Sequence, residues 1–518
     1  MYTTYSTEQL ERTPHTGMLG SPATTLRSEG AVALPLVVAL CERLAAAAIS
    51  YCHWKSNDVI ERSATGENDL DLLVSRADAE RFTAILHELG FKAAHETHPW
   101  GMPGILDYYG YDESSGRLVH AHIHYQLVIG EDMTKNYHLP LEAPYLASAV
   151  QGELFKTPAP AFELIIFVIR MILKHSTWDT ILGRWGTLSK AERRELAYLQ
   201  KLAEPRRVAE ILATHLPSID GALFNRCVEA LRPDAPLWTR LWVGHQVQRQ
   251  LKVFARRSPW RDAGLRFWRR GRLAYRRRFT QLPRRRLNRG GALLAIVGGD
   301  GAGKTTAVET VTQWLGAELD VTKVHLGKPA WSRTTKVVRA LLNLGRKVTG
   351  APYVEWAAVL YEDYREVHGF AAYCLALRSL CLARDLYGSY AAARRMASNG
   401  ALVVCDRFPL AAVTWMDAPH IGQLLEVHGR PNRLLRWLAR WERRYFAAIL
   451  PPEVLLVLRL DPAIAAQRRA DESQQPVLAR NQGIWQVAWA KLDAHVVDAS
   501  CPPDEVRAAL KTGVWAKL

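Results

Sequence analysis

The chain has 518 residues, which is more than one hydrophobic core normally accommodates, so two or three domains are expected. Its apolar content of 48% and charged content of 23% are those of an ordinary soluble globular protein. The net charge of +16 is concentrated in residues 256–289, which carry fourteen arginines and one acid. Because the basic character is local, the overall charge is no argument for nucleic-acid binding by the whole chain.

The seven cysteines are scattered and form no C-x-x-C pair, which excludes a disulfide framework and a zinc site of that type. No secretory signal pattern is visible at the N-terminus. Two apolar runs, residues 31–49 and 162–173, are interrupted by charge or too short to span a bilayer. We therefore expect a cytoplasmic protein with reduced thiols and no transmembrane segment.

Residues 1–30 are rich in Thr, Ser, Gly and Pro without periodicity, which predicts a disordered tail. Residues 31–142 mix helical and strand patterns and are predicted to form an α+β domain. The elements expected there are a helix over 36–49, a strand over 68–74, a helix over 77–89 closed by Gly90, and a strand over 118–129. Residues 143–250 are predicted as a helical region, in which Ser189 and Glu192 have capping-box spacing.

Residues 251–290 form an Arg-rich segment that is predicted as a linker, and residues 291–518 form the last domain. In this domain apolar strands alternate with helices, a pattern that predicts a parallel sheet with helices on both faces. The expected strands are 293–297, 321–326, 401–405, 454–460 and 495–497. The fold class is therefore α/β.

A phosphate-binding loop follows the first strand of this domain. The run Gly298 to Thr305 matches G-x-x-x-x-G-K-[ST] and lies between an apolar strand and an amphipathic helix. Glycines let successive backbone N–H groups point at a phosphate, the lysine reaches the β- and γ-phosphates, and the threonine hydroxyl binds Mg²⁺. The candidate ATP-binding residues are Gly298, Asp300, Gly301, Gly303, Lys304, Thr305 and Thr306.

Two further features complete a candidate phosphoryl-transfer site. Asp406 and Arg407 end a second strand, where an acid can hold Mg²⁺ and an arginine can bind phosphate. Arg468, Arg469 and Arg480 lie on or near a later helix and are candidates to neutralise the transferring phosphoryl group, although a solvated helix face explains their spacing equally well.

Residues 291–518 resemble the thymidylate kinase family of nucleoside-monophosphate kinases. The resemblance rests on the Asp300-Gly301 pair ahead of Lys-Thr-Thr, the helix that carries Arg384, the Asp406-Arg407-Phe408 motif and the lid-like run from Asp461. It implies ATP and Mg²⁺ as donor and cofactor, and an anionic acceptor. It also implies that Arg384 and Arg407 hold the acceptor's anionic group, and the candidate substrate-binding residues are Asp300, Lys328, Arg384 and Arg407.

The acceptor side departs from this family in one loop. Thymidylate kinases carry an Arg-Glu-Pro-Gly type sequence after the second strand, whereas this chain has a different run between His325 and Arg333. The motifs of the ATP-binding half of the site match the family, whereas the acceptor loop has a different sequence. Thymidylate is therefore not the expected substrate.

Asp69 and Asp71 lie on one face of a predicted strand, about 6.5–7 Å apart, where two carboxylates can share divalent metal ions. With Ser56 in the preceding turn, residues 36–130 resemble polymerase-β-like nucleotidyltransferases. Two positions depart from that family: Lys55 replaces the glycine before the serine, and His122 stands where a third carboxylate is expected. The third carboxylate is therefore degenerate.

The candidate metal ligands of this module are Asp69, Asp71 and His122, and those of the kinase-like domain are Thr305 and Asp406. A neutral imidazole suits a transition metal better than Mg²⁺. The alternating run from His120 to His124 is either a metal site or a set of satisfied strand residues. In the helical region, Arg170 and His175 have the spacing of a nuclease motif, but the apolar context favours a buried structural histidine.

The Arg-rich segment from Arg256 to Arg289 interleaves aromatic residues with arginines. It is compatible with an anionic surface partner or with an interdomain contact, and no groove-reading motif indicates sequence-specific nucleic-acid binding. Homo-oligomerisation stays open.

Three functions are compatible with these motifs. The first is an ATP-Mg-dependent phosphotransferase acting on a small anionic or hydroxylated metabolite, fused to a nucleotidyltransferase-like module and making an activated precursor. The second is a nucleotide-sensing regulator or defence-type effector. The third is a true thymidylate kinase with accessory domains.

Overall fold

The computed structural model describes residues 32–96, 102, 104–177, 188–279, 284–349, 370–410, 412–413, 418–422, 433–471 and 474–518. The predicted tail over 1–30 lies outside the described residues. Over the described part, the chain is an α/β protein with a parallel sheet, as expected. None of the helices described here has both the length and the apolar character that crossing a bilayer requires.

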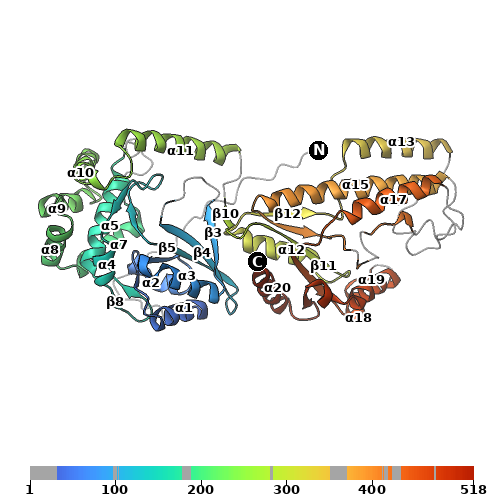
Figure 1. Ribbon diagram of the computed structural model, residues 1–518, viewed down its shortest axis with the longest axis horizontal. Helices are drawn as coiled ribbons and strands as arrows, with labels where there is room; N and C mark the ends of the chain where they lie inside the picture. The colour runs from blue at the N-terminus through green and yellow to red at the C-terminus, as the bar shows by residue number, and fades with distance from the viewer. Residues whose placement is uncertain are drawn as a thin grey trace, which may run out of the picture. The chain divides into compact units, whose positions relative to one another are not determined.

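The N-terminal module is built on a six-stranded mixed sheet in the order β1-β2-β5-β4-β3-β10, in which only β2 and β5 pair in parallel (Figure 1). The strands are β1 (Tyr51–His53), β2 (Leu70–Val74), β3 (Lys92–Glu96), β4 (Ile105–Asp112), β5 (Arg117–His124) and β10 (Arg285–Leu287). The helices are α1 (Pro35–Ala46), α2 (Ile60–Ala64) and α3 (Ala79–Glu88). Helices α1 and α3 share one apolar core with β2 and β5.

Two predictions for this module need correction. The strand expected over 118–129 ends at His124, because the chain turns there and β6 (Leu127–Ile129) pairs with β7 (Tyr137–Leu139) in a separate two-stranded sheet. The segment predicted as a linker contains regular structure, the helix α11 (Pro259–Phe279) and the edge strand β10.

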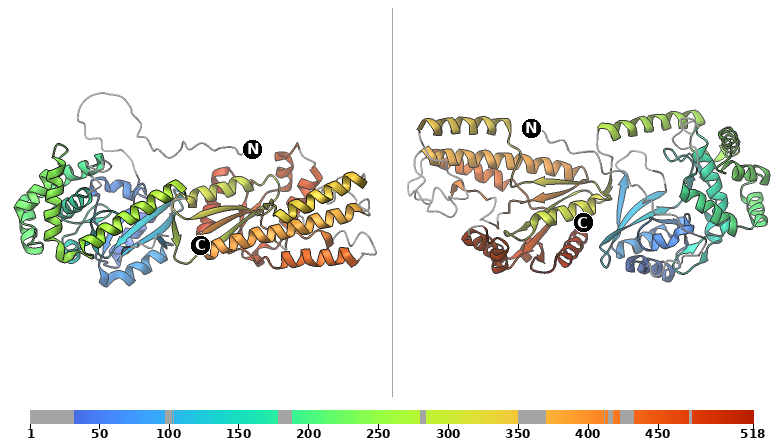
Figure 2. Two further views of the ribbon diagram at one scale, coloured as in Figure 1. Left: turned by 90° about the horizontal axis from the view of Figure 1, so that it is seen from above. Right: turned by 180° about the vertical axis from the view of Figure 1, so that it is seen from behind.

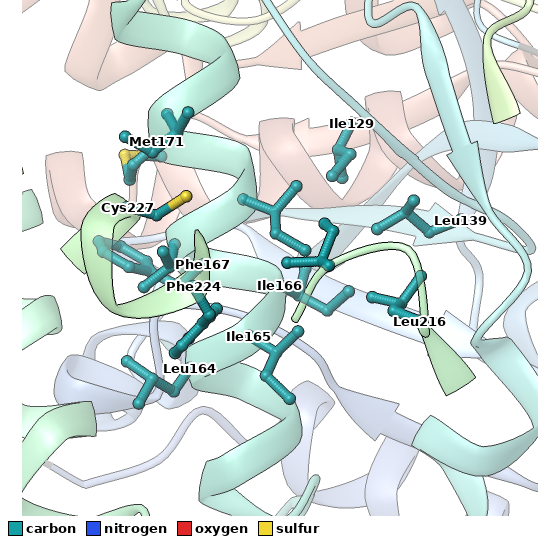
Figure 3. Close-up of a cluster of buried hydrophobic side chains, with 14 of the residues drawn as sticks. Ile129, Leu139, Leu164, Ile165, Ile166, Phe167, Met171, Leu216, Phe224 and Cys227 are labelled. Carbon is teal, nitrogen blue, oxygen red and sulfur yellow. The ribbon is translucent and has the colours of Figure 1, made fainter. Parts of the chain in front are cut away.

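The helical region surrounds α5 (Pro160–His175), which is buried along most of its length. Figure 3 shows its side chains, among them Ile165, Phe167 and Met171, packed with Phe224 and Cys227 of a neighbouring helix. The other elements are α4 (Glu142–Ala147), β8 (Val150–Gln151), β9 (Lys156–Thr157), α7 (Lys190–Leu202), α8 (Pro205–His215), α9 (Gly221–Ala230) and α10 (Leu237–Gln250). The predicted capping box at Ser189 and Glu192 is present at the start of α7.

The C-terminal module is a five-stranded parallel sheet in the order β12-β13-β11-β14-β15. The strands are β11 (Ala292–Gly298), β12 (Val321–His325), β13 (Leu402–Asp406), β14 (Val454–Arg459) and β15 (His495–Asp498). The helices are α12 (Lys304–Gly316), α13 (Arg333–Thr349), α15 (Phe370–Ser398), α17 (Arg433–Ala447), α18 (Pro462–Arg468), α19 (Gln474–Gln486) and α20 (Pro503–Lys517).

Both faces of this sheet are covered by helices (Figure 2). On β11, Leu294 and Ile296 pack with α12 and α20, while Leu293 and Ala295 pack with α15 on the opposite face. Successive residues of a strand point to opposite faces, so an apolar run of this kind is expected where both faces are buried. The sequence prediction for this sheet is confirmed.

Candidate functional site

The phosphate-binding loop connects β11 to α12. Gly301 and Gly303 have positive φ angles of 74° and 81°, which glycine adopts without strain. The Lys304 ammonium donates a hydrogen bond to the Gly299 carbonyl at 2.7 Å and lies 3.9 Å from a carboxylate oxygen of Asp300. The lysine is therefore folded over the loop at the N-terminus of α12, where backbone N–H groups attract an anion.

Lys304 is largely buried, and burial lowers its pKa to about 8, even though Asp300 favours the charged form. Removing an ammonium group from water disfavours its charge unless a negative partner lies close by. A polyphosphate in this loop would supply that partner. The electrostatics of the free site thus favour an anionic ligand.

Asn481 of α19 holds the loop from one side and was not anticipated from the sequence. Its side chain is fully buried and its Nδ2 donates to the carbonyl oxygen of Asp300 at 3.1 Å. A Cβ atom placed on Gly299 would lie only 1.9 Å from Oδ1 of Asn481. No local pattern marks Asn481, because its partners are about 180 residues away in the chain.

The three predicted lid arginines all approach the loop. A guanidinium nitrogen of Arg480 lies 2.6 Å from the Asp300 carboxylate, and Arg468 donates to the Gly301 carbonyl at 3.3 Å. The aliphatic part of Arg469 passes beside Gly301. These contacts place cationic side chains around the loop from the α18–α19 side.

Asp406 is the last residue of β13, and Arg407 follows it at the same edge of the sheet. Asp406 is buried and in register with His325 of β12, whose Nε2 lies 3.8 Å from the Asp406 carboxylate. Arg407 has a φ of 56°, an uncommon value outside glycine, and its side chain lies against Gly327. Thr305 stands in the first turn of α12, followed by Thr306.

Two cavities lie on the two sides of the contact between Arg407 and Gly327. The first is lined by Val297, Gly298, Lys304, Arg407, Phe408, Val413 and Ile484. The second is lined by Leu326, Gly327, Ser379, Leu382, Ala383, Leu386, Ala418, His420, Glu442 and Phe446. Arg407 lines the first cavity and contacts Gly327, which lines the second.

The second cavity contains a buried carboxyl group that the sequence did not reveal. Glu442 accepts hydrogen bonds from the Ser379 hydroxyl at 2.5 Å and from the Ile421 backbone N–H at 2.8 Å. Burial raises the pKa of Glu442 and lowers that of His420 to about 4. This cavity is therefore mostly apolar, with a neutral imidazole and an oriented carboxyl group.

The remaining predicted acceptor residues have structural partners. Arg384 donates to the hydroxyls of Ser332 and Thr335 at the start of α13, and lies 3.1 Å from Asp385. Lys328 is exposed and its backbone N–H donates to His325 Nδ1 at 3.2 Å. Arg384 thus holds the end of the loop that differs from the family and the first turn of α13.

The N-terminal module places three ionisable residues in one row across its sheet. Asp71 of β2 is in register with His122 of β5, and His122 is in register with Asp107 of β4. Asp107 is a carboxylate that the sequence analysis missed. Strand β4 alternates in burial only at its start, and only the pairing of β4 with β5 brings Asp107 into this row.

Each carboxylate of this module already has a cationic or hydrogen-bonding partner. Lys55 Nζ lies 2.8 Å from Asp71, and His120 lies 2.8 Å from both Asp69 and Asp107. Burial alone would lower the pKa of His120, but its hydrogen bonds to Asp107 and Asp69 raise it to about 9. Burial alone would raise the pKa of Asp71, yet Lys55 and His122 hold it far below its usual range.

A second set of atoms converges beside Asp71. His122 Nδ1 lies 3.1 Å from a carboxylate oxygen of Asp71 and 3.3 Å from His124 Nε2. The ligand atoms of these three residues all lie within 4.8 Å of one another. His124 is 1% exposed, and its other nitrogen, Nδ1, is buried without a hydrogen-bond partner.

Helices of the middle region form the back of this site. Ser56 has a φ of 59°, and its N–H donates to Glu195 of α7 at 3.1 Å. Arg170 of α5 lies 3.5 Å from the same carboxylate. His175 is 2% exposed and lies 3.4 Å from Glu192, so it is the buried histidine that the apolar context predicted.

A parallel sheet whose central strand leads through a glycine-rich loop into a helix, with a lysine at its start, defines a P-loop nucleotide-binding unit. Over 232 residues the chain is 26% identical to YghR of Escherichia coli strain K12, named as an uncharacterized ATP-binding protein; the match covers 41% of this chain and 83% of that protein. The protein of the same name from Escherichia coli O6:H1 gives the same values. A scan against protein-family models found no match. The similarity supports a P-loop ATP-binding region in this chain.

Proposed function

We propose that the C-terminal module transfers the γ-phosphoryl group of ATP to a small acceptor, in the manner of thymidylate-kinase-like enzymes. The observation that carries this proposal is a pair of cavities linked by the contact between Arg407 and Gly327: one is lined by the P-loop lysine and Arg407, and the other by Gly327 with residues of α15 and α17. A donor pocket that holds cationic side chains and adjoins a second pocket for the acceptor suits in-line phosphoryl transfer.

The residues have distinct roles in this proposal. The loop N–H groups and Lys304 bind the polyphosphate, and Thr305 with Asp406 would hold Mg²⁺, which supplies charge neutralisation on the phosphate oxygens. Arg407, together with Arg468 and the other lid arginines, stabilises negative charge on the transferring group. The acceptor oxygen forms a bond to the γ-phosphorus, the bond to the ADP oxygen breaks, and a hydroxyl acceptor releases its proton to solvent.

The second cavity favours an acceptor other than thymidylate. Its wall is mostly apolar, and its polar groups are a neutral His420 and the Ser379–Glu442 pair. Arg384, which the family resemblance assigns to the acceptor phosphate, is hydrogen-bonded to α13. A hydroxylated metabolite that reaches Arg407 with its anionic or nucleophilic end fits this chemistry better than a pyrimidine nucleotide.

The test is ADP release by the purified protein with ATP, Mg²⁺ and a panel of nucleoside monophosphates, sugars, sugar phosphates and polyols. We expect one acceptor class to support turnover at about 1–100 per second. Lys304→Ala should lower that rate at least about 100-fold, because it removes the cation that binds the transferring phosphate. The matched control is Lys491→Ala, which removes an exposed lysine that lines neither cavity.

Other outcomes identify the alternatives. ADP formation that depends on dTMP alone would show a true thymidylate kinase with accessory domains. Tight ATP binding without turnover, combined with nucleotide transfer onto a macromolecule that disappears in Asp69→Ala or Asp71→Ala, would show a nucleotide-sensing regulator or effector. No stimulation by any acceptor together with no nucleotide transfer would refute the phosphotransferase proposal.

For the N-terminal module, we propose a nucleotidyltransferase-like unit that binds one transition-metal ion through Asp71, His122 and His124. In a tetrahedral site with metal–ligand bonds of about 2.0–2.1 Å, ligand atoms lie about 3.3 Å apart. The Asp71–His122 and His122–His124 separations of 3.1 and 3.3 Å match that spacing. A single proton on His122 Nδ1 cannot serve both short contacts well, whereas a cation satisfies all three lone pairs.

Equilibrium dialysis with Zn²⁺, and the visible spectrum with Co²⁺, measure this binding directly. We expect one ion per chain, with an affinity about 100-fold lower in His122→Asn. Lys55→Met should bind the ion more tightly, because it removes the ammonium beside Asp71. The control is His87→Asn, at an exposed histidine of α3. Equal affinity of His122→Asn and the unsubstituted protein would refute the site.

A further inference from the structure

Helix α11 is amphipathic in an unusual sense, because arginines line its inner face and aromatic side chains line its outer face. It is one continuous helix of 21 residues (Figures 1 and 2). From the sequence, its arginines are compatible with either an interdomain contact or the binding of an anionic surface partner. The side-chain contacts assign the first role to the inner face of the helix and leave its outer face open to a surface partner.

The inner face binds the loop after β6. Arg269 is 5% exposed and its guanidinium donates to the carbonyl oxygen of Met133, and Arg270 lies 2.6 Å from Glu131. Just before the helix, Arg256 donates to the carbonyl of Lys135 at 3.2 Å. These arginines are therefore used to attach the helix to its own module.

The outer face carries a continuous aromatic stripe. Its members lie 7, 8, 15 and 19 residues after the first, which places them on one side of a helix. Their exposed fractions range from 53% to 89%, although single exposed aromatics on a protein surface are usually scattered. The stripe consists of Trp260, Phe267, Trp268, Tyr275 and Phe279.

Cations border this stripe. Arg261 and Arg278 are exposed near its two ends, and the guanidinium of Arg272 lies 5.3 Å from the centre of the Trp268 ring. Small residues, Gly264 and Gly271, lie between the aromatic rings on the same face. The outer face is thus an apolar strip about 30 Å long with arginines at its margins.

We propose that α11 docks this face onto the headgroup region of an anionic phospholipid bilayer. Trp and Tyr rings favour the membrane–water interface, and bordering arginines pair with lipid phosphates. The helix lies in the plane of the surface, because its inner face is fixed by Arg269 and Arg270 to the protein. This proposal is independent of the kinase activity.

A nucleic acid fits the same surface less well. Binding to a polynucleotide requires cations that follow the phosphate backbone, usually along a groove. Here Arg269 and Arg270 in the middle of the helix face the protein, and the outward surface is a convex row of rings. The charge at the margins and the aromatic centre together match a lipid surface.

The test is co-sedimentation of the full chain with vesicles of phosphatidylcholine alone or phosphatidylcholine with phosphatidylglycerol. We expect binding to the anionic vesicles that weakens with salt and is much lower on phosphatidylcholine alone. Trp260→Ser/Phe267→Ser should lower the partition coefficient at least about tenfold, since it removes two interfacial rings. The matched control is Trp238→Ser/Trp242→Ser, which removes two exposed tryptophans of α10.

Circular dichroism melting of each variant checks that the helix variant remains folded, and Arg261→Gln/Arg278→Gln gives a second variant that keeps every ring. Lower anionic-vesicle binding by both α11 variants supports the proposal. Equal sedimentation of the α11 and α10 variants overturns it, as does a dimer in solution that the α11 variant converts to monomer. Loss of oligonucleotide binding in the same variant, without vesicle binding by the unsubstituted protein, also overturns it.

Discussion

The two candidate sites of this chain differ in how their charges are matched. At the P-loop, Lys304 and Arg480 contact the carboxylate of Asp300. The loop region also holds Asp406 and three further arginines, which are Arg407, Arg468 and Arg469. At the N-terminal sheet, Asp69, Asp71 and Asp107 meet Lys55, His120 and Arg285 at salt-bridge distances. The first site has an excess of positive charge, and the second is balanced by the protein's own side chains.

This difference shows that the presence of motif residues does not by itself mean that a site can accept a charged ligand. The P-loop gains favourable interactions when a polyphosphate enters, because Lys304 loses the penalty of its burial. A pair of Mg²⁺ ions at the N-terminal sheet would instead have to displace Lys55 and His120 from their carboxylates. The same comparison predicts that Asp71 contributes mainly to the stability of the fold and that Asp406 contributes mainly to phosphoryl transfer.

A large effect is expected on local stability at Asp71. Asp71→Asn leaves Lys55 without its carboxylate, so the free energy of opening β2 and β5 should fall by about 2 kcal/mol. Asp406→Asn should change stability by less than about 0.5 kcal/mol, since its carboxylate lies 3.8 Å from His325 Nε2, too far for a strong interaction. Native-state hydrogen exchange of the strand amides measures both.

The activity of the same two variants should follow the opposite order. Asp406→Asn is expected to lower acceptor-dependent ADP formation about 100-fold, and Asp71→Asn should leave it within a factor of two. If Asp406→Asn destabilises β13 as strongly as Asp71→Asn destabilises β2, the proposed difference between the two sites is contradicted.

A smaller effect concerns pH. The pKa of Lys304 in the free protein is about 8, below the usual value of 10.5, so its ammonium is lost as pH rises through 8. Because ATP binding requires the charged form, the dissociation constant for ATP should increase about eightfold between pH 7.5 and 9. Isothermal titration calorimetry measures this slope. Arginine stays charged over this pH range, so Lys304→Arg should abolish the pH dependence of the ATP dissociation constant. An equal pH dependence in both proteins would contradict the assignment of this effect to Lys304.

The sequence was sufficient for features that are local in the chain. The run from Gly298 to Thr305 is contiguous, so its chemistry could be predicted before its surroundings were known. The apolar strands of the C-terminal module likewise predicted a sheet buried on both faces, because period-two alternation is absent.

Features that depend on pairing between distant segments could not be predicted. Asp107 enters the N-terminal site only through the register of β4 with β5, and Glu442 enters the second cavity from a helix 63 residues beyond its partner Ser379. The orientation of α11 was also hidden, because arginines usually mark a solvated face. Here the backbone carbonyls of the loop near Met133 accept their hydrogen bonds.

The contact between Gly299 and Asn481 has a consequence for how this protein can change over time. The Asn481 amide occupies the space in which any side chain at position 299 would lie, so no larger residue fits there while Asn481 remains. A substitution at either position alone therefore disturbs the loop or leaves it unsupported. We therefore expect residues 299 and 481 to change together, with a larger residue at position 299 accompanied by a side chain smaller than asparagine at position 481.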